Sequence, residues 1–323
     1  MKRVAVLTSG GDAPGMNAAV RAAVRTGAAL GLEMLGVRRG YAGLIAGDFV
    51  PLGPRAVGGI IERGGTVLGT SRCTEFLADA GQREAIAQLQ RHEISGLVVI
   101  GGNGSQRGAC ALARQGVRVV GIASTIDNDL AGSDVTIGAT TALGIALEAI
   151  DRLRVTASAH GRMFLVEVMG RHSGYLALHA GIAGGAEAIL IPEIETEPES
   201  LAAAVLAAYR RGKSHAIVVV AEGARHDADA LARHFEAHRE RLGFELRVSK
   251  LGHIQRGGVP CAFDRLSATV LGAAAVQELY AGRDGVLAGI VAGKTTFTPL
   301  AAATAARKNP DLQLMELARA LAE

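Results

Sequence analysis

The chain has 323 residues and a net charge of +3, and 49% of its residues are hydrophobic, which is typical of globular proteins with one large or two medium domains. The small net charge and the 3% aromatic content argue against nucleic-acid binding, and the lack of a long apolar run argues against a membrane protein. Three widely spaced cysteines, Cys73, Cys110 and Cys261, show no metal-ligand spacing, so we expect a protein of the reducing cytoplasm.

Apolar segments typical of β-strands alternate with amphipathic segments typical of helices from one end of the chain to the other. The predicted strands are Arg3–Thr8, Leu32–Val37, Gly96–Ile100, Val117–Ile122, Met163–Met169, Ala188–Ile191, Ala216–Ala221 and Arg247–Leu251. The predicted helices are Met16–Leu30, Gln82–His92, Ser105–Gln115, Thr140–Arg154, Gly174–Ile182, Glu199–Arg211, Ala228–Leu242 and Asp264–Tyr280. Runs of Val, Ile and Leu joined by helices predict an α/β fold with mainly parallel sheets covered on both faces. At this chain length we expect two α/β units with a cleft between them.

Two glycine-rich junctions follow predicted strands. The first is Ser9-Gly10-Gly11-Asp12-Ala13-Pro14-Gly15, and the second is Gly101-Gly102-Asn103-Gly104-Ser105. Glycines between a strand and a helix let backbone N–H groups approach a phosphate at the helix N-terminus, and Ser105 is placed to cap the second helix. Neither junction has the spacing of the dinucleotide fingerprint or of the P-loop. Together they predict one polyphosphate held from two sides.

The most informative segment is Thr125-Ile126-Asp127-Asn128-Asp129, which follows the predicted strand Val117–Ile122. Two carboxylates one residue apart at the end of a buried strand are unfavourable in a hydrophobic core and well suited to a catalytic site. One carboxylate can act as a general base, and the other can lie near a metal or orient the base.

Polar residues also end three later strands. These junctions are Met169-Gly170-Arg171-His172-Ser173-Gly174, Glu222-Gly223 and His253-Ile254-Gln255-Arg256-Gly257-Gly258. Arginine binds phosphate with two hydrogen bonds, while glutamate and histidine bind hydroxyl groups. Because ligands of parallel α/β sheets bind at the carboxyl ends of strands, the set predicts a phosphorylated polyhydroxy ligand.

Two segments imitate functional motifs. Ala288–Thr295 satisfies a loose P-loop pattern, but the following Thr296–Pro299 cannot open the helix that this motif needs. The charged stretch His234–Arg241 is interpreted as a solvated helix face with opposite charges in i,i+4 reach.

Across nearly its whole length the chain resembles the bacterial ATP-dependent 6-phosphofructokinase family. The matching motifs are Gly10-Gly11-Asp12-Ala13-Pro14-Gly15-Met16-Asn17, Thr125–Asp129, Met169-Gly170-Arg171, Pro192-Glu193 and Gly252–Gly258. The resemblance implies a cytoplasmic, homotetrameric glycolytic enzyme that uses Mg²⁺ to transfer the γ-phosphoryl group of ATP to the 1-hydroxyl of fructose 6-phosphate. It implies two similar doubly wound domains with an active-site cleft between them. These are a large nucleotide-binding domain, 1–138 plus about 256–308, and a small sugar-phosphate domain, 139–255 plus about 309–323.

The resemblance also implies a role for individual residues. Asp127 matches the general base; Thr125 and Asp129 match residues flanking the transferred group, with Asp129 near the metal; Arg72 and Arg171 match cations at the transferring phosphoryl. The nucleotide site corresponds to Gly11, Tyr41, Arg72, Cys73, Gly102, Asn103, Gly104, Ser105 and Gly108. The sugar-phosphate site corresponds to Thr125, Asp127, Met169, Gly170, Arg171, Glu222, His253 and Arg256, with Arg162 and Arg247 reaching in from a neighbouring subunit.

The chain departs from the family at the nucleotide site. Asn103 replaces an aspartate that the family associates with magnesium, so we expect the metal to be held more weakly or differently. Ser124 replaces a glycine and could crowd the nucleotide phosphates. Pyrophosphate-using relatives carry aspartate at position 104 and lysine at position 124, and Gly104 and Ser124 match neither, which favours ATP.

The family's effector site is only partly preserved. The matching residues are Arg21, Arg25, Arg154, Glu187, Arg211 and Lys213. Pro54, Gly59 and Ser214 replace an arginine, an aspartate and a lysine of that site. With fewer cations to hold an anionic effector, we expect a weakened or absent response to ADP and phosphoenolpyruvate.

Three alternatives to an active ATP-dependent enzyme stay open at this point. One is a catalytically degenerate, regulatory paralogue, for which Asn103 is the main argument and the retained Asp127 and Asp129 are arguments against. The second is a pyrophosphate-dependent enzyme. The third is a kinase for another sugar phosphate, such as sedoheptulose 7-phosphate.

Overall fold

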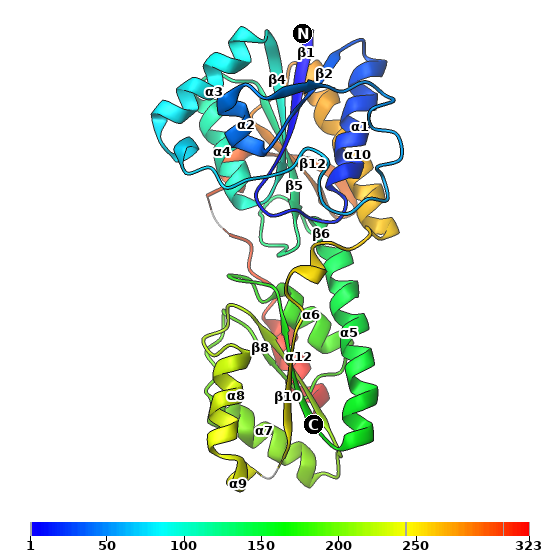
Figure 1. Ribbon diagram of the computed structural model, residues 1–323, viewed down its shortest axis with the longest axis vertical. Helices are drawn as coiled ribbons and strands as arrows, with labels where there is room; N and C mark the ends of the chain where they lie inside the picture. Colours follow the sequence, from blue (N-terminus) through cyan, green and yellow to red (C-terminus); the bar gives the residue numbers. More distant parts are fainter. Residues whose placement is uncertain (1, 243, 306, 323) are drawn as a thin grey trace. The chain divides into compact units, whose positions relative to one another are not determined.

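The structure is a computed structural model that describes residues 2–242, 244–305 and 307–322. The chain forms two compact units, each built on its own sheet (Figure 1). The first unit comprises the residues up to Thr141 together with Arg256–Lys308, and the second comprises Ala142–Gln255 and the chain from Asn309 onward. No described helix is both long enough and apolar enough to cross a membrane.

The sheet of the first unit contains β1 (Arg3–Ser9), β2 (Glu33–Val37), β3 (Phe49–Pro51), β4 (Ile94–Gly101), β5 (Val119–Thr125), β6 (Ile137–Gly138), β11 (Val286–Val291) and β12 (Lys294–Pro299). Its strand order is β12-β11-β5-β4-β1-β2-β3, with β6 beside β5. The inner strands run parallel, whereas β3 and β12 pair antiparallel with their neighbours. These inner strands read as near-continuous apolar runs because both of their faces are buried.

Helices cover both faces of this sheet. They are α1 (Met16–Ala29), α2 (Gly40–Ala46), α3 (Asp79–Arg91), α4 (Asn103–Arg114), α10 (Ala262–Tyr280) and α11 (Leu300–Ala303), with a short 3₁₀ turn η1 (Glu75–Leu77). Figure 1 shows α1 against α10 on one side of the sheet and α2, α3 and α4 on the other. Leu97 and Val99 of β4 face the α2–α4 core, and the alternating Val98 and Ile100 are also buried, as expected where successive side chains point to opposite covered faces.

The second unit is built on a smaller, all-parallel sheet. Its strands β7 (Met163–Val168), β8 (Ala188–Leu190), β9 (Ala216–Ala221) and β10 (Leu246–Lys250) lie in the order β10-β7-β9-β8. Its helices are α6 (Tyr175–Ala183), α7 (Pro198–Arg210), α8 (Ala228–Ala237), α9 (Arg239–Leu242) and α12 (Gln313–Ala322), with the 3₁₀ turn η2 (Gly252–Gln255). Helix α5 (Ala139–His160) begins in the first unit and lies mostly in the second.

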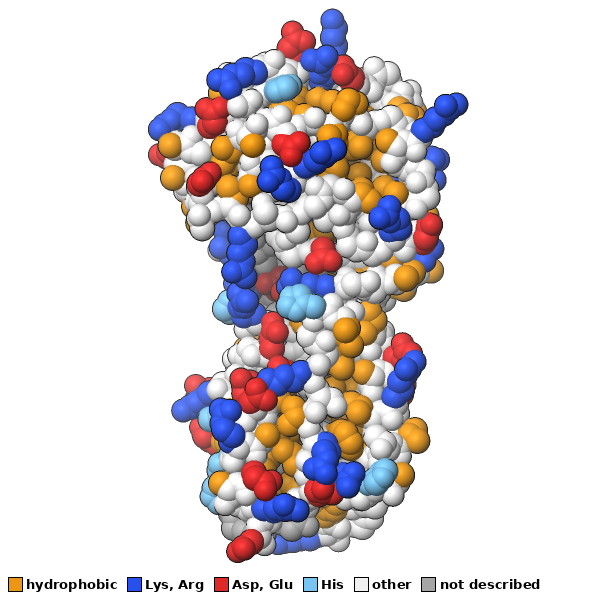
Figure 2. Space-filling model, in the orientation of Figure 1, with side chains coloured by type: hydrophobic (Ala, Val, Ile, Leu, Met, Phe, Trp, Pro, Cys, Tyr) orange, Lys and Arg blue, Asp and Glu red, His pale blue; other side chains and the backbone are white. Residues whose placement is uncertain are grey.

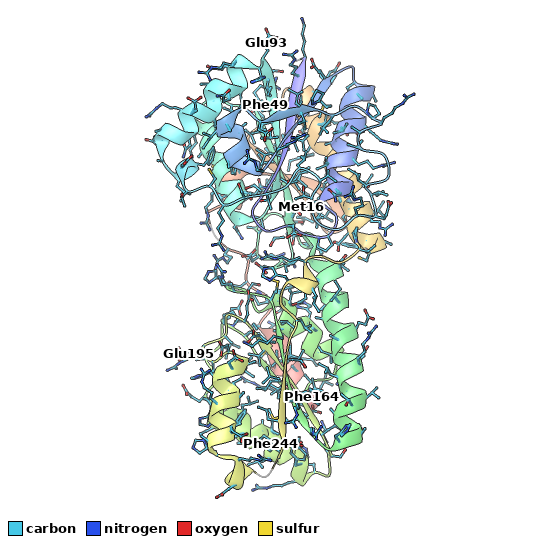
Figure 3. All side chains as sticks on the ribbon, viewed as in Figure 1. Met16, Phe49, Glu93, Phe164, Glu195 and Phe244 are labelled. Carbon is cyan, nitrogen blue, oxygen red and sulfur yellow. The ribbon has the colours of Figure 1, made fainter. Side chains whose placement is uncertain are left out.

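Each unit has its own hydrophobic core. Figure 3 labels one core residue in each, Met16 at the start of α1 and Phe164 on β7, and both are buried. On the face of the molecule seen in Figure 2, basic and acidic side chains are interspersed, in line with the small net charge. The α/β class with mainly parallel sheets is therefore confirmed.

Each predicted strand is present, with ends within three residues of the prediction. Two helix predictions need correction. The helix predicted to end at Arg154 continues to His160, where Gly161 with φ +62° follows it. The helix predicted over Ala228–Leu242 is two helices, because His238 adopts a non-helical conformation and its ring contacts the carbonyl oxygen of His234. The side chain of Arg241, at the end of the predicted charged face, lies outside the described residues.

The loose P-loop pattern at Ala288–Thr295 belongs to a β-hairpin. Strands β11 and β12 pair antiparallel across a tight turn in which Ala292 and Gly293 have φ of +50° and +73°. Strand β12 follows the glycine directly, where a P-loop would open a helix, so the rejection of a phosphate-binding P-loop at this segment is confirmed.

Candidate active site

The carboxyl ends of three neighbouring parallel strands, β1, β4 and β5, meet at one edge of the first unit's sheet. Ser9 pairs with Gly101, and Gly101 pairs with Ala123, so the loops after these strands begin side by side. A cavity of about 210 Å³ lies among these loops. It is lined by Gly10, Gly11, Asp12, Gly102, Asn103, Gly104, Ser105, Ser124, Thr125, Ile126, Asp127, Asp129 and Arg256. The two glycine loops and the carboxylate loop thus form one site.

Glycines permit close packing at the floor of this cavity. Gly10 has φ of +84°, a left-handed conformation that favours glycine. A Cβ atom at position 11 would lie 2.7 Å from a guanidinium nitrogen of Arg256. The resemblance assigns Arg256 to the sugar-phosphate site, and the structure places its guanidinium over Gly11, beside the phosphate-type loops. The cation and the backbone amides together make this cavity suitable for an anion.

Helix α4 begins two residues earlier than predicted, which changes the role of Ser105. The helix starts at Asn103 after Gly102 as N-cap, so the prediction that Ser105 caps the helix is wrong. The Ser105 hydroxyl packs inside the site, where it would lie 2.5 Å from a Cβ atom at Gly101. The first turn of α4 therefore presents backbone N–H groups to the cavity, with the positive end of the helix dipole behind them.

The loop after β5 is held by its own polar groups. The backbone N–H of Asp127 donates to Thr125 Oγ1 at 3.2 Å, and Thr136 Oγ1 donates to the carbonyl oxygen of Thr125 at 2.6 Å. Asn128 has φ of +47°, which is uncommon for a residue with a side chain. Ser124 is fully buried and its hydroxyl donates to the carbonyl oxygen of Ile137 at 3.4 Å, so the side chain is turned toward β6.

Asp129 is the most buried carboxylate of the site. Burial raises its pKa above the usual range, an effect partly offset by the Arg307 guanidinium, whose Nε lies 3.4 Å from Asp129 Oδ2. The Asn103 side-chain amide donates to the Asp129 backbone carbonyl at 3.1 Å. An aspartate at position 103 could not donate this bond while ionised. Asn103 therefore links the start of α4 to the carboxylate loop.

The donor set of the cavity fits a hard divalent cation. Asp12, Asp127 and Asp129 line it, and the amide oxygen of Asn103 is a further ligand of the type that Mg²⁺ prefers. Among the described residues, no three His, Cys, Asp or Glu side chains are grouped closely enough to hold a metal by themselves. Mg²⁺ commonly takes one or two carboxylates and completes its shell with water and nucleotide phosphates, so the site suits a metal that binds together with its nucleotide.

The remaining predicted nucleotide residues lie beside or behind the cavity. Tyr41 is buried, donates to the Ser105 carbonyl at 2.6 Å and stacks on Phe76 with ring centroids 4.0 Å apart. A Cβ atom at Gly108 would lie 2.7 Å from the Tyr41 ring, so this glycine lets the ring brace α4. Arg72 is exposed, and the neighbouring Cys73 packs against the core; neither lines the cavity.

The predicted sugar-phosphate residues gather at one edge of the second unit's sheet. Met169-Gly170-Arg171 follows β7, Glu222 follows β9 and His253 follows β10, which are adjacent parallel strands. A Cβ atom at Gly223 would lie 1.8 Å from the Arg171 carbonyl oxygen, so the loops after β7 and β9 are in direct contact. The side chains of Arg171, Glu222 and His253 are exposed, which leaves their charged and polar groups accessible to a ligand.

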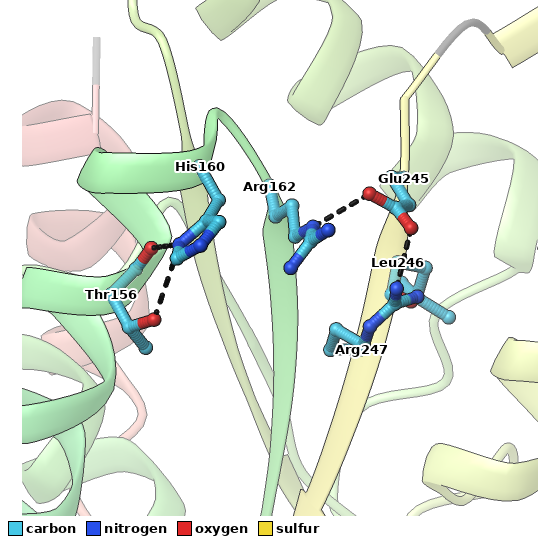
Figure 4. A network of polar contacts seen from close by, with 6 residues as sticks. All are labelled: Thr156, His160, Arg162, Glu245, Leu246 and Arg247. Carbon is cyan, nitrogen blue, oxygen red and sulfur yellow. Dashed lines mark hydrogen bonds and ion pairs between the residues drawn. The ribbon is translucent and has the colours of Figure 1, made fainter.

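Arg162 and Arg247 lie at the opposite edge of the same sheet. Arg162 directly precedes β7, and Arg247 pairs with Phe164 near the amino end of that strand. Figure 4 shows Glu245 between the two arginines: Oε2 accepts from Arg162 Nε at 2.6 Å, and Oε1 accepts from an Arg247 guanidinium nitrogen at 2.5 Å. The bond from Arg162 lowers the pKa of Glu245, with Arg247 adding to the effect. Within one chain, these arginines and the Arg171 loop are separated by the length of a strand.

The residues that match the effector site fall into two groups, one in each unit. In the first unit Arg21 and Arg25 lie on α1, and Arg25 borders a surface hollow with Pro54. In the second unit Glu187 accepts from Lys213 Nζ at 3.1 Å and from the Ile217 backbone N–H. In that unit Arg154 donates to the Gly185 carbonyl at 2.9 Å, and Arg211 donates to the Ala322 carbonyl at 3.0 Å. The second-unit cations already have partners within the chain.

Sequence reasoning missed two residues that organise the site. Gln106 is fully buried, and its side-chain amide donates to carbonyl oxygens of Val99, Gly101 and Ile122, which joins the ends of β4 and β5. Lys308 reaches the carboxylate loop from near the other end of the chain. Neither residue belongs to a local motif, because their partners are brought together only by the folded sheet.

Comparison with known proteins shows which family the chain is similar to. The family model described as Phosphofructokinase matches residues 3–279. The chain is 54% identical over 323 residues to ATP-dependent 6-phosphofructokinase 1 of Thermus thermophilus, with both chains fully covered. It is 52% identical to the ATP-dependent 6-phosphofructokinase of Thermotoga neapolitana, covering 99% of this chain and 100% of the relative. The crystal structure of Pichia pastoris phosphofructokinase in the T-state superposes with a TM-score of 0.88 at 36% identity, over 99% of this chain and 36% of that one.

Proposed function

The chain belongs to the phosphofructokinase family, and from that premise we propose how its residues carry out the reaction. The activity is that of an ATP-dependent 6-phosphofructokinase, a glycolytic kinase that converts fructose 6-phosphate and ATP into fructose 1,6-bisphosphate and ADP. The observation that carries the mechanism is the position of Asp127 in one cavity with two glycine-rich loops at the ends of β1 and β4.

The glycine loops hold the nucleotide phosphates. Gly11 and the first turn of α4 line the cavity and offer it backbone N–H donors, and Arg256 supplies a positive charge beside Gly11. Phosphoryl transfer needs positioning and charge neutralisation more than covalent chemistry, so preorganised amides and cations are the main catalytic resource. We assign Arg72 and Arg171 as further cations that approach the transferring group, because both are exposed.

Asp127 takes the proton of the sugar's 1-hydroxyl group. As that proton passes to an Asp127 oxygen, the hydroxyl oxygen forms a bond to the γ-phosphorus. The bond between that phosphorus and the bridging oxygen breaks, and ADP leaves with the electron pair. The Thr125 hydroxyl orients the base by accepting the Asp127 backbone N–H at 3.2 Å.

We propose Mg²⁺ as the metal, held by Asp129 and by the oxygen of Asn103, which stands where the family has aspartate. When bound, it neutralises charge on the β- and γ-phosphates. Asp129 suits this role because it is ionisable and largely buried, and because its closest ion-pair contact, with Arg307, is as long as 3.4 Å.

Met169, Arg171, Glu222 and His253 hold the sugar phosphate, since they gather at one edge of the second sheet. Arg162 and Arg247 lie at the other edge, so we assign them to the sugar-phosphate site of a neighbouring copy in a homotetramer. The three unpaired cysteines suit a cytoplasmic location.

ATP is favoured over pyrophosphate by the space at Gly104. A Cβ atom there would have no neighbour within 4 Å, which leaves room for the α-phosphate that ATP has and pyrophosphate lacks. The full-length relatives that are 46–54% identical carry the name ATP-dependent 6-phosphofructokinase, and this disfavours both the pyrophosphate-dependent and the degenerate alternative. We propose that effectors act weakly, because the cations matched in the second unit bind Glu187 and backbone carbonyls of their own chain.

The test compares ATP with pyrophosphate as phosphoryl donor, and wild type with a variant that lacks the general base. We expect wild-type protein with Mg²⁺ to form fructose 1,6-bisphosphate from ATP and not from pyrophosphate. Asp127→Asn should lower kcat about 10²–10⁴-fold because it removes the general base, with nucleotide affinity within about threefold of wild type. Turnover of sedoheptulose 7-phosphate with a higher kcat/KM than fructose 6-phosphate would overturn the substrate assignment.

A further inference from the structure

The segment Arg307–Lys308 lies directly against the loop that carries Asp127 and Asp129. Arg307 forms an antiparallel bridge with Leu130, and the backbone N–H of Lys308 donates to the Asp129 carbonyl at 3.0 Å. Lys308 is 180 positions from Asn128 in the sequence. This contact is therefore a product of tertiary folding and belongs to no sequence motif of the site.

The Lys308 ammonium group donates hydrogen bonds to this loop. It donates to Asn128 Oδ1 at 3.0 Å and to the carbonyl oxygens of Ser133 and Asp134 at 2.7 and 2.8 Å. An ammonium has three N–H donors, and three acceptors of one loop surround it. Lys308 thus joins the start of the loop, at Asn128, to its return segment, at Ser133 and Asp134.

The loop needs such a cross-link because its turn is unfavourable. Asn128 holds φ at +47°, and a non-glycine residue in this region costs on the order of 1 kcal/mol or more. The Asn128 side chain compensates from within the loop: its Nδ2 donates to the Asp134 carbonyl at 3.0 Å, and its Oδ1 accepts from the Thr136 N–H at 2.9 Å. Lys308 binds the same Asn128 oxygen and the same Asp134 carbonyl, which completes the network.

We propose that Lys308 is a positioning residue for phosphoryl transfer, which sets the orientation of Asp127 and Asp129 on either side of Asn128. The proposal rests on the function proposed above, in which Asp127 is the general base. Because a displacement of about 1 Å can cost about a hundredfold in rate, loosening the turn at Asn128 should slow the chemical step. The glycine loops after β1 and β4 make none of the described Lys308 contacts, so the KM values for both substrates should change little when Mg²⁺ is saturating.

The experiment compares Lys308→Met, which keeps the apolar stem and removes the donors, with Lys294→Met, an exposed lysine of β12. We expect Lys308→Met to lower kcat about 10–100-fold, with the KM values for ATP and fructose 6-phosphate within about threefold of wild type. Lys294→Met should match wild type. In Lys308→Met, hydrogen exchange should speed up at the Thr136 amide and leave the amides of α1 unchanged.

A purely structural lysine predicts a different pattern: lower thermal stability, faster exchange throughout the first unit, and unchanged kcat per folded molecule. That pattern, or a kcat within twofold of wild type, would overturn the proposal while the wild-type activity leaves the proposed function standing. An inactive wild-type protein would overturn the function itself. If Lys308→Met does not fold, Lys308→Gln is measured instead. Its side chain is one atom shorter and carries two N–H donors, so it cannot make all three bonds of Lys308, and wild-type kcat in folded Lys308→Gln also contradicts the proposal.

Discussion

Asn103→Asp tests whether the asparagine in the nucleotide site is a structural link or a weakened metal ligand. In the structure its amide donates to the Asp129 carbonyl at 3.1 Å, a bond that an aspartate cannot make. The same carbonyl also accepts the Lys308 N–H at 3.0 Å, so it stays partnered after the substitution. The loss is therefore that of one ordinary hydrogen bond, about 1 kcal/mol, without the added cost of an orphaned acceptor.

The new charge adds a second penalty when no metal is bound. Burial already raises the pKa of Asp129, and the Asn103 amide counteracts that effect. A carboxylate at position 103 would oppose ionisation of Asp129, so we expect a total loss of about 1–2 kcal/mol in metal-free buffer. For a protein of this size that corresponds to a fall in Tm of about 1.5–3 °C.

Magnesium should reduce the stability deficit of Asn103→Asp. Two carboxylates hold Mg²⁺ better than one carboxylate and an amide, so the Tm deficit of Asn103→Asp should shrink in millimolar Mg²⁺ with nucleotide. The Mg²⁺ concentration that half-saturates the rate should fall about tenfold. Asn103→Ala is the matched control, because it loses the bond, adds no charge and should keep its deficit when Mg²⁺ is added. Equal stability of Asn103→Asp and wild type in EDTA, or a deficit that ignores Mg²⁺, would refute this reasoning.

Two further predictions concern charges elsewhere in the chain. Glu245→Gln releases Arg162 and Arg247 from their carboxylate. The fructose 6-phosphate concentration at half-maximal rate should therefore fall modestly, by up to about fivefold because exposed ion pairs are weak, with kcat unchanged. Glu33→Gln is the control: it breaks a comparable ion pair with Arg3 and should leave the dependence of rate on fructose 6-phosphate unaltered. If both variants shift that dependence equally, the assignment of Arg162 and Arg247 is wrong. Burial lowers the pKa of Lys308 to about 8, so the folded protein releases that proton at a lower pH than the unfolded chain does. The free energy of unfolding in urea should therefore rise for wild type relative to Lys308→Met between pH 8 and 10.5. A difference between the two proteins that does not change with pH would contradict this.

Much of the fold could be predicted because its strands are locally encoded. A strand such as β9 is a continuous apolar run between turn residues, and its predicted bounds, Ala216–Ala221, are those of the structure. The hairpin of β11 and β12 was missed as a strand pair, since its second strand, Lys294–Pro299, is polar and only partly buried. Helix α2, Gly40–Ala46, is too short to show a period.

The residues of the candidate site were also recognisable in part. Glycines and carboxylates stood out at strand ends, and parallel strands bring such ends to one edge. Their roles within the site were less accessible. Ser105 was predicted to cap α4, but the helix starts earlier because Gly102 is its N-cap.

The sequence by itself determined the alternation of strands and helices, the polar junctions and the family, because each of these depends on residues close together in the chain. Only the tertiary structure decided which junctions share a cavity and what supports them. It placed Arg256 over Gly11, turned Asn103 toward the Asp129 carbonyl and brought Lys308 to Asn128. Such contacts depend on the order of strands in the sheet and on where distant segments return to it, and no local pattern of residues records either.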